Sequence, residues 1–156
     1  LIYMVKRITL LIVAAVLAVG AAMAQDPIRW RTTVKMTNDT EGVLTVRALV
    51  ADGWHLYGTS LPKGGPKPTA FSFAKSTGIK FIDKAFTASV APVTEFDATF
   101  NMKLTYWRTN VTFTRRFRLT GPRDKAFING TITFMGCNGE NCLRPSTITV
   151  NKLRIK

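Results

Sequence analysis

Apolar and polar residues alternate with a period of two along much of the chain beyond residue 24. The alternation is most regular over residues 44–50, 111–119 and 128–135. It places apolar side chains on one face of a strand and polar side chains on the other, as in a half-buried β-strand. Arg115 interrupts the second stretch, because it falls in the apolar phase. Helical periodicity is weak, so the pattern predicts an all-β protein.

The last alternating stretch changes phase within itself. Ile148 and Val150 lie in one phase, whereas Leu153 and Ile155 lie in the other. An extra residue in one strand of an antiparallel pair produces such a change. We therefore expect a β-bulge near Asn151.

Other apolar segments flanked by Gly, Pro, Asn and Asp predict further strands, at residues 28–36, 69–74, 79–85 and 103–107. About eight short strands separated by such turn residues are typical of a two-sheet β-sandwich. Residues 58–68 are rich in Gly and Pro and predict a rigid loop, and residues 92–101 predict a second, turn-rich connection.

The first 24 residues have the organisation of a secretory signal peptide. Reading from Met4, two basic residues precede an apolar run over 8–19, and Ala22-Met23-Ala24 supplies an Ala-x-Ala cleavage site. The run is shorter than a typical membrane span, which needs about 20 residues. We expect residues 1–24 to be removed, with 1–3 upstream of the initiator. Residues 25–156 then form one soluble, exported domain where disulfides can form.

The chain is strongly basic, with 22 Lys and Arg against 9 Asp and Glu and a net charge of +13. Nucleic acid is the usual partner of such a charge, but an exported protein rarely meets it. An acidic partner, anionic lipid or envelope polymer is favoured over nucleic acid, and a merely solvated basic surface is favoured over all of these.

The only two cysteines, Cys137 and Cys142, are separated by four residues and followed by Pro145. A bridge between them closes a ring of about six residues, which stabilises a fold by about 2 kcal/mol against about 4 for a bridge spanning about sixty residues. Short, strained or exposed bridges are the exchangeable ones. A local bridge that only pins the end of a hairpin is the alternative, and spacing alone leaves both open. Gly136 and Gly139 are expected to let this segment turn tightly.

Metal chemistry is poorly supported. Structural zinc takes four Cys or His ligands, and this chain offers two cysteines and His55. Blue copper uses two histidines. We therefore expect no cofactor beyond the sulfurs, and no small-molecule substrate, since no hydrolase or phosphate-binding constellation is present.

Two carboxylates, Glu95 and Asp97, lie in an otherwise basic region. A carboxylate near a sulfur pair raises a thiol pKa and can relay a proton during exchange. Asp in a loop is more often a turn former. Phe100 is open to two interpretations as well, a core residue or a lid over a disulfide.

Two segments together resemble one family, the N-terminal domain of the thiol:disulfide interchange protein DsbD. Residues 52–57, Asp-Gly-Trp-His-Leu-Tyr, followed by 61–69, Leu-Pro-Lys-Gly-Gly-Pro-Lys-Pro-Thr, resemble the first half of that domain. Residues 134–145, from Phe-Met-Gly-Cys to Cys-Leu-Arg-Pro, resemble its cysteine hairpin. The likeness covers nearly the whole mature chain.

The resemblance implies an immunoglobulin-like sandwich in the bacterial periplasm. Such a domain accepts electrons from a membrane transporter and passes them to oxidised thioredoxin-like partners, among them disulfide isomerases and cytochrome-maturation thioredoxins. By position the redox pair is Cys137 and Cys142, the second being favoured for the mixed disulfide. The residues implied to support the pair are the acidic Asp97, the aromatic cap Phe100, and the neighbouring aromatic residues Trp54 and Tyr57.

The chain departs from the family pattern at two positions. Arg144 precedes a single proline where the family often has two, and Ala98 replaces a second acidic residue. Because the chain stops at Lys156, we expect its electron donor to act in trans. The competing hypotheses are a binding or adhesion sandwich with an inert disulfide, working through Arg116 and Arg118, and a degenerate homologue that only docks redox partners.

Overall fold

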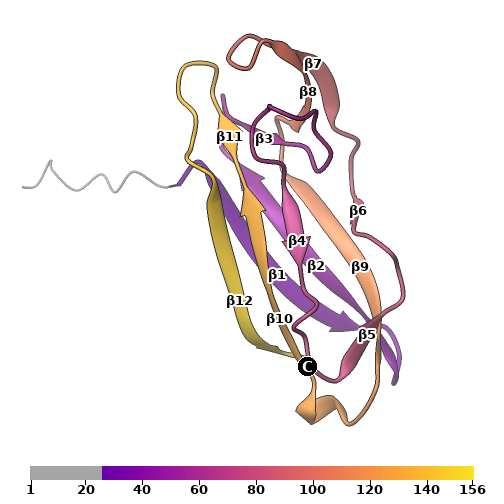
Figure 1. Cartoon of the computed structure of the whole chain (residues 1–156). Helices are drawn as coiled ribbons and strands as arrows, with labels where there is room; N and C mark the ends of the chain where they lie inside the picture. Colours follow the sequence, from indigo (N-terminus) through magenta and orange to yellow (C-terminus); the bar gives the residue numbers. More distant parts are fainter. Residues whose placement is uncertain (1–25) are drawn as a thin grey trace, which may run out of the picture.

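The structure is a computed structural model that describes residues 26–156, so the predicted signal peptide lies outside the described residues. One antiparallel sheet, sheet A, forms a layer of an elongated sandwich (Figure 1). Its strands are β1 (Ile28–Met36), β2 (Glu41–Val50), β9 (Val111–Leu119) and β5 (Ile79–Phe81), with β6 (Thr87–Ala88) also paired to β9.

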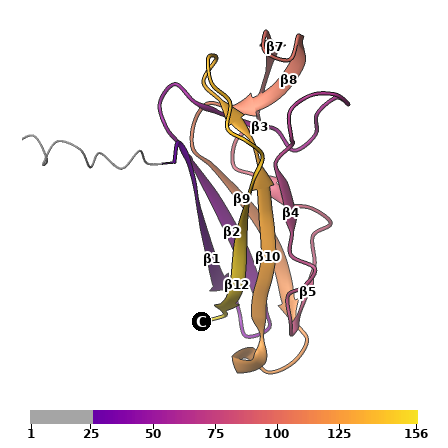
Figure 2. The ribbon, with the colours of Figure 1, turned by 60° about the vertical axis from the view of Figure 1, so that its left-hand side comes forward.

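Sheet C forms the facing layer, and a third sheet closes one end of the sandwich (Figure 2). The strands of sheet C are β12 (Ser146–Arg154), β10 (Phe127–Phe134) and β4 (Ala70–Ser72). Sheet B, at the end, contains β11 (Gly136–Cys137), β3 (His55–Tyr57), β8 (Met102–Trp107) and β7 (Val93–Asp97). A 3₁₀ turn, η1 (Arg123–Lys125), precedes β10.

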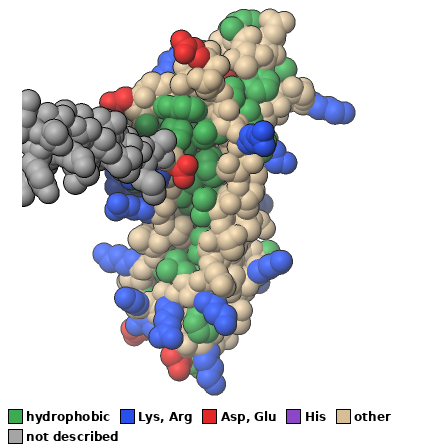
Figure 3. All heavy atoms as spheres, turned by 90° about the vertical axis from the view of Figure 1, so that its left-hand side faces the viewer, with side chains coloured by type: hydrophobic (Ala, Val, Ile, Leu, Met, Phe, Trp, Pro, Cys, Tyr) green, Lys and Arg blue, Asp and Glu red, His purple; other side chains and the backbone are tan. Residues whose placement is uncertain are grey.

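The main core lies between sheets A and C, as the alternation predicts. Its fully buried residues include Leu44 and Val46 of β2, Phe113 and Phe117 of β9, and Ile132 of β10. Burying side chains of this size stabilises a fold by about 1.5–3 kcal/mol each. In Figure 3, which looks onto the side where β1 and β12 lie, hydrophobic side chains gather between flanks that carry Lys and Arg.

The prediction of an all-β sandwich is confirmed, while its details differ from the sequence expectation. Twelve strands are present among residues 26–156, several of only two or three residues, where about eight were expected. The strands predicted at 69–74 and 79–85 are shorter than expected. The expectation of a turn-rich connection over 92–101 is wrong for its first half, because Val93–Asp97 pairs with β8 as β7.

The predicted bulge is present. The register of β10 and β12 shifts between Ile128 and Gly130, which pair with Leu153 and Val150. Asn129 therefore faces two residues, and Lys152 adopts a left-handed φ of 47° while its amide donates to the Asn129 side-chain oxygen at 2.8 Å. This extra residue changes the phase of β12, as the sequence indicated.

Arg115 occupies the inner phase of β9 without burying its charge. Its guanidinium lies 4.2 Å from the centre of the Phe81 ring and donates hydrogen bonds to the carbonyl oxygens of Asp83 and Lys84. The cation–π contact and the hydrogen bonds of the guanidinium group compensate for placing a charged side chain in the inner phase.

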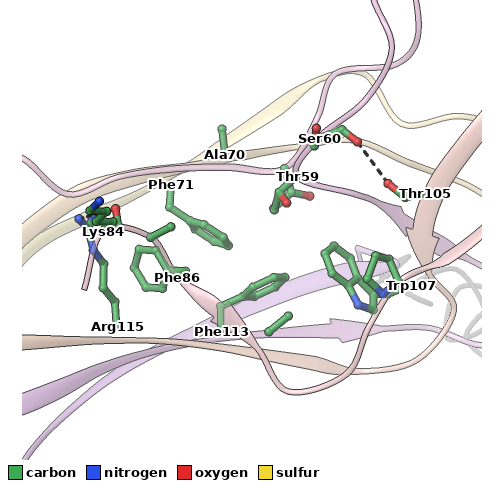
Figure 4. Close-up of a pocket in the computed structure, with 14 residues that line it drawn as sticks. Thr59, Ser60, Ala70, Phe71, Lys84, Phe86, Thr105, Trp107, Phe113 and Arg115 are labelled. Atoms are coloured by element: carbon green, nitrogen blue, oxygen red, sulfur yellow. Dashed lines mark hydrogen bonds between the residues drawn. The ribbon is translucent and has the colours of Figure 1, made fainter. Parts of the chain in front are cut away.

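A cavity of about 510 Å³ lies beside Arg115 and away from the cysteines (Figure 4). Aromatic side chains of Phe71, Phe86, Phe113 and Trp107 line it, with Lys84 and Arg115 at one end.

Two chain segments run from the sandwich directly into sheet B and thereby place the cysteine hairpin. After β2, four residues lead into β3, and after β10 a single residue, Met135, leads into β11. Since β3 pairs with both β11 and β8, sheet B is a hydrogen-bonded extension of both layers. No helix within residues 26–156 is long and apolar enough to cross a membrane.

The close approach of β10 and β4 gives a test of the packing. A Cβ added at Gly130 would collide with the carbonyl oxygen of Ser72 and lie 2.5 Å from Cδ1 of Phe73. Gly130→Ala is expected to lower the free energy of unfolding by about 1–3 kcal/mol. Urea denaturation measures this. Gly121→Ala, with nothing within 4 Å of the added atom, is the control and should change stability by less than about 0.5 kcal/mol.

Candidate functional site

The cysteine hairpin follows β10 and is closed by its own backbone and side-chain bonds. Cys137 and Cys142 are joined by a disulfide and pair as an antiparallel bridge. The side-chain oxygen of Asn138 accepts hydrogen bonds from the amides of residues 140 and 141, at 3.0 and 2.7 Å. Gly139 has a φ of +90°, which only glycine adopts without strain.

Gly136 does not act as the turn residue that the sequence suggested. It lies buried in β11, where an added Cβ would meet Ile28 and lie 2.6 Å from the carbonyl oxygen of His55. Its role is therefore the close approach of β11 to β3.

The two sulfurs differ sharply in their access to solvent. Cys137 is 1% exposed and packs with Tyr57, Leu104 and Tyr106, whereas Cys142 is exposed. An incoming thiolate must reach the sulfur that it attacks, so the geometry favours attack at Cys142 and departure of Cys137.

One hydroxyl group connects the buried sulfur to a buried carboxylate. Tyr57 lies fully buried in β3, and its hydroxyl donates to Oδ2 of Asp97 at 2.7 Å. The hydroxyl oxygen of Tyr57 also lies 3.2 Å from Sγ of Cys137. Burial, followed by the hydrogen bond to Asp97, raises the pKa of Tyr57 far above its usual value. The phenol therefore keeps its proton and can turn it from the carboxylate to the sulfur.

Asp97 ends β7 and is held by the turn that follows. Its Oδ1 accepts the amides of Thr99 and Phe100 at 2.9 and 3.2 Å, an arrangement typical of Asx turns. The Phe100 ring then packs against the cluster of Tyr57 and Cys137, edge-on to Tyr57 with ring centres 5.8 Å apart. The two sequence interpretations of Asp97, turn former and neighbour of the sulfurs, thus hold together.

His55 lies directly opposite Cys137 in the pairing of β3 and β11. Its ring contacts Tyr57 and Tyr106, with ring centres 4.9 and 4.5 Å away. Its Nε2 is buried without a hydrogen-bond partner among residues 26–156 and lies 3.9 Å from Oδ2 of Asp97. Burial lowers the pKa of His55 below its usual value, although the attraction of Asp97 opposes this.

A more exposed ion pair borders the buried cluster. Arg108 donates two hydrogen bonds to Glu95, at 2.8 and 2.7 Å, and the Tyr106 hydroxyl donates a third at 2.7 Å. The hydrogen bonds from Arg108 and then Tyr106 lower the pKa of Glu95 to about 2. Burial and the bond to Glu95 raise the pKa of Tyr106 to about 12.

All these side chains project from one face of sheet B. The register pairs Cys137 with His55 and Tyr57 with Tyr106, and alternate residues of β7 bring in Asp97. The opposite face carries Leu56 and Trp107 into the main core. A cavity of about 310 Å³ lies between the cysteine hairpin and β7–β8, lined by residues that include His55, Glu95, Asp97, Asn138 and Gly139.

Most of the residues named by resemblance come together, with one exception. Asp97, Phe100 and Tyr57 surround Cys137, but Trp54 is not among the side chains packed on this cluster. The sequence patterns did not indicate the contributions of His55, Tyr106 and Arg108 to this site. The first two could have been found from strand alternation, since His55 shares the phase of Tyr57.

Comparison with known protein families agrees with the resemblance seen in the sequence. The family described as thiol:disulfide interchange protein DsbD, N-terminal, matches residues 22–154. The chain belongs to this DsbD N-terminal family. Within residues 26–156 no group of three or more His, Cys, Asp or Glu could hold a metal ion.

A solved structure shares the fold of this DsbD N-terminal domain. It is the N-terminal periplasmic domain of ScsB from Proteus mirabilis, with 16% sequence identity and a TM-score of 0.56. The alignment covers 83% of the present chain and 47% of the ScsB chain, so the protein spans about half the length of that structure. No curated protein matches the sequence.

The unpartnered histidine gives a pH-dependent prediction. Because its pKa is lower in the folded state, the unfolded chain takes up a proton first as the pH falls below about 6.5. The free energy of unfolding should therefore keep its full value above pH 7 and decrease as the pH falls towards 5. Denaturation at several pH values measures the slope, and NMR titration of this single histidine measures the pKa.

His55→Phe is the matched control, since it keeps an aromatic ring between Tyr57 and Tyr106 but cannot titrate. The variant should lose the His-dependent part of the slope. A measured pKa above 6.5 would show that attraction to Asp97 outweighs burial and would contradict the prediction.

Proposed function

We propose that this protein is a periplasmic thiol-disulfide exchange module that relays reducing equivalents through Cys137 and Cys142 to oxidised protein partners. The observation that carries the proposal is the unequal exposure of the two sulfurs beside a buried phenol and carboxylate. Membership of the DsbD N-terminal family supports a role in thiol:disulfide interchange. The predicted signal peptide supports export to an oxidising compartment.

The first step is attack by the thiolate of a reduced partner on Sγ of Cys142. A bond forms between the partner sulfur and Cys142, the Cys137–Cys142 bond breaks, and Cys137 leaves with the electron pair as a thiolate. Tyr57 turns its hydroxyl from Asp97 to the new thiolate and stabilises it. Asp97 meanwhile retains the two amide donors of its turn.

The second step completes the reduction. The partner's other thiolate attacks the partner sulfur of the mixed disulfide, so the partner is oxidised and Cys142 leaves as a thiolate. Both thiolates take up protons to give the dithiol. The same steps in reverse reduce an oxidised acceptor. Thioredoxin-like proteins and a membrane electron transporter in trans are the proposed partners, and the exposed Phe96 of β7 offers them an apolar contact beside the cavity.

The competing proposal, an inert disulfide in a binding sandwich, predicts a different reduction potential. A structural bridge has a potential below about −300 mV, and an exchanging bridge lies above it. Equilibration with glutathione or thioredoxin buffers measures this value. A potential below that limit would favour the inert bridge.

Trapping a mixed disulfide tests which sulfur is attacked. Cys137→Ser leaves the exposed Cys142 as a free thiol. The probe is a single-cysteine thioredoxin whose thiol carries thionitrobenzoate as a mixed disulfide. Cys142 should attack this disulfide and displace thionitrobenzoate. The product is a covalent adduct, visible on non-reducing electrophoresis. Cys142→Ser, which leaves only the buried Cys137, is the matched control and should react at least tenfold more slowly. Equal rates would refute the proposed order.

Removing the Tyr57 hydroxyl tests its part in the reaction. Tyr57→Phe should slow reduction of the disulfide by at least about tenfold, because a hydrogen bond to a charged group contributes about 1.5–3 kcal/mol and about 1.4 kcal/mol is a factor of ten in rate. Quenched-flow thiol labelling with a reduced thioredoxin measures the rate. Tyr106→Phe removes a hydroxyl bonded to Glu95 and not to sulfur, so its rate should change less than twofold. A similar loss in both variants would mean that only packing matters.

A further inference from the structure

Sheet A presents a dense array of cations on its outer surface. Alternate residues of β1 are exposed, and the outward positions of the neighbouring strands continue the array. We call this surface the cationic face. Its basic residues are Arg29, Arg31, Lys35, Arg47, Lys80, Arg116 and Arg118.

The strand register arranges these cations in cross-strand rows. Arg31 stands directly opposite Arg47, and Lys80 stands opposite Arg118. Val43 pairs with Lys35 on one side and with Arg116 on the other. Successive rows on one face of a sheet lie about 7 Å apart. The cationic face is therefore a broad two-dimensional array and not one deep pocket.

Few carboxylates neutralise this array. Glu41 pairs with Arg118, and Asp83 pairs with Arg116 at 2.8 Å. The remaining cations, Arg29, Arg31, Lys35, Arg47 and Lys80, form no ion pair within residues 26–156.

The outer surface of sheet C is quite different. Most of its paired outward positions on β4, β10 and β12 carry hydroxyl and methyl side chains, from Ala70, Ser72, Thr131, Thr133, Thr147 and Thr149. The exception is at one end of the sheet, where the exposed Arg154 pairs with Phe127. Seven basic residues lie on the outer face of sheet A, whereas the paired outward positions of sheet C carry one, Arg154. A general need for solubility gives no reason for this difference.

Like charges placed directly opposite each other destabilise a sheet, so the Arg31–Arg47 pair works against folding. An anion placed between the two guanidinium groups removes that repulsion. A bilayer with anionic headgroups supplies many phosphates in one plane, and each Lys or Arg near such a surface adds to the attraction. The repetition of the cations over four neighbouring strands matches this kind of partner.

We propose that the cationic face binds the surface of bilayers rich in anionic phospholipid through the lipid phosphates. The proposal does not depend on exchange at the cysteines. Sheet B continues beyond the end of sheet A where β2 leads into β3. Contact through sheet A therefore leaves the end of the sandwich with Cys142 free (Figure 1).

Vesicle binding tests the proposal. Residues 25–156 are mixed with sedimentable vesicles of phosphatidylglycerol and phosphatidylcholine, or of phosphatidylcholine alone, at low ionic strength. We expect binding to the anionic vesicles only. In about 0.5 M NaCl, where charges are screened beyond about 4–5 Å, binding should be lost.

Two variants with equal charge loss locate the surface. The first triple variant removes three unpaired cations of the cationic face, by Arg29→Gln, Arg31→Gln and Arg47→Gln. The second triple variant removes three exposed cations elsewhere, by Lys63→Gln, Lys67→Gln and Lys103→Gln. The first triple variant should weaken vesicle binding at least tenfold, and the second less than threefold. Thermal unfolding of both variants confirms that they remain folded.

Three results would overturn the proposal. They are the absence of binding to anionic vesicles, an equal loss of binding in both triple variants, and binding to polyglutamate with none to vesicles. The last result would indicate an acidic protein as the partner. Because the readout needs no thiol chemistry, its failure is distinguishable from failure of the proposed exchange function.

Discussion

The arrangement of the site depends on one buried hydroxyl group that has two acceptors. Tyr57 bonds to Asp97 at 2.7 Å and lies 3.2 Å from the sulfur of Cys137, and a single proton can serve only one of them fully at a time. A buried carboxylate needs donors, so β7 must end in a turn whose amides face Asp97. That turn in turn brings Phe100 over the cluster. These contacts near the sulfur thus follow from one requirement. The buried phenol and carboxylate need hydrogen-bond partners where water does not reach them.

The same constraint explains why the site lies on a separate sheet. Polar side chains that must converge cannot lie between sheets A and C, where aliphatic and aromatic residues fill the space. Sheet B has one face in that core, through Leu56 and Trp107, and its other face is free to carry Tyr57 and Cys137. Short extensions from β2 and β10 attach this second face rigidly to the body. The sandwich therefore holds the main core, and its terminal sheet holds the candidate site.

Local pattern was sufficient for much of the fold and for part of the site. Alternation marked the long strands, and the phase change beyond Val150 marked the bulge in β12 opposite Asn129. It failed for β7, because an exposed hairpin strand such as Val93–Asp97 has no buried face to impose alternation. The convergence of His55 with Asp97 depends on the register of three strands distant in sequence, which residue patterns do not contain. Resemblance supplied Asp97 and Tyr57 where local pattern could not.

The distribution of charge separates the two surfaces for which we propose functions. Around the cysteines the carboxylates Glu95, Asp97 and Glu140 are mixed with the cations Arg108 and Arg144, whereas the outer surface of sheet A is mainly basic. A partner at Cys142 therefore meets a different potential from an anionic bilayer at the cationic face, and the two contacts need not compete. Since four residues join β2 of sheet A to β3 of sheet B, the proposed binding through sheet A would restrict the direction in which Cys142 faces. Orientation at a surface increases productive encounters without any change at the sulfurs themselves.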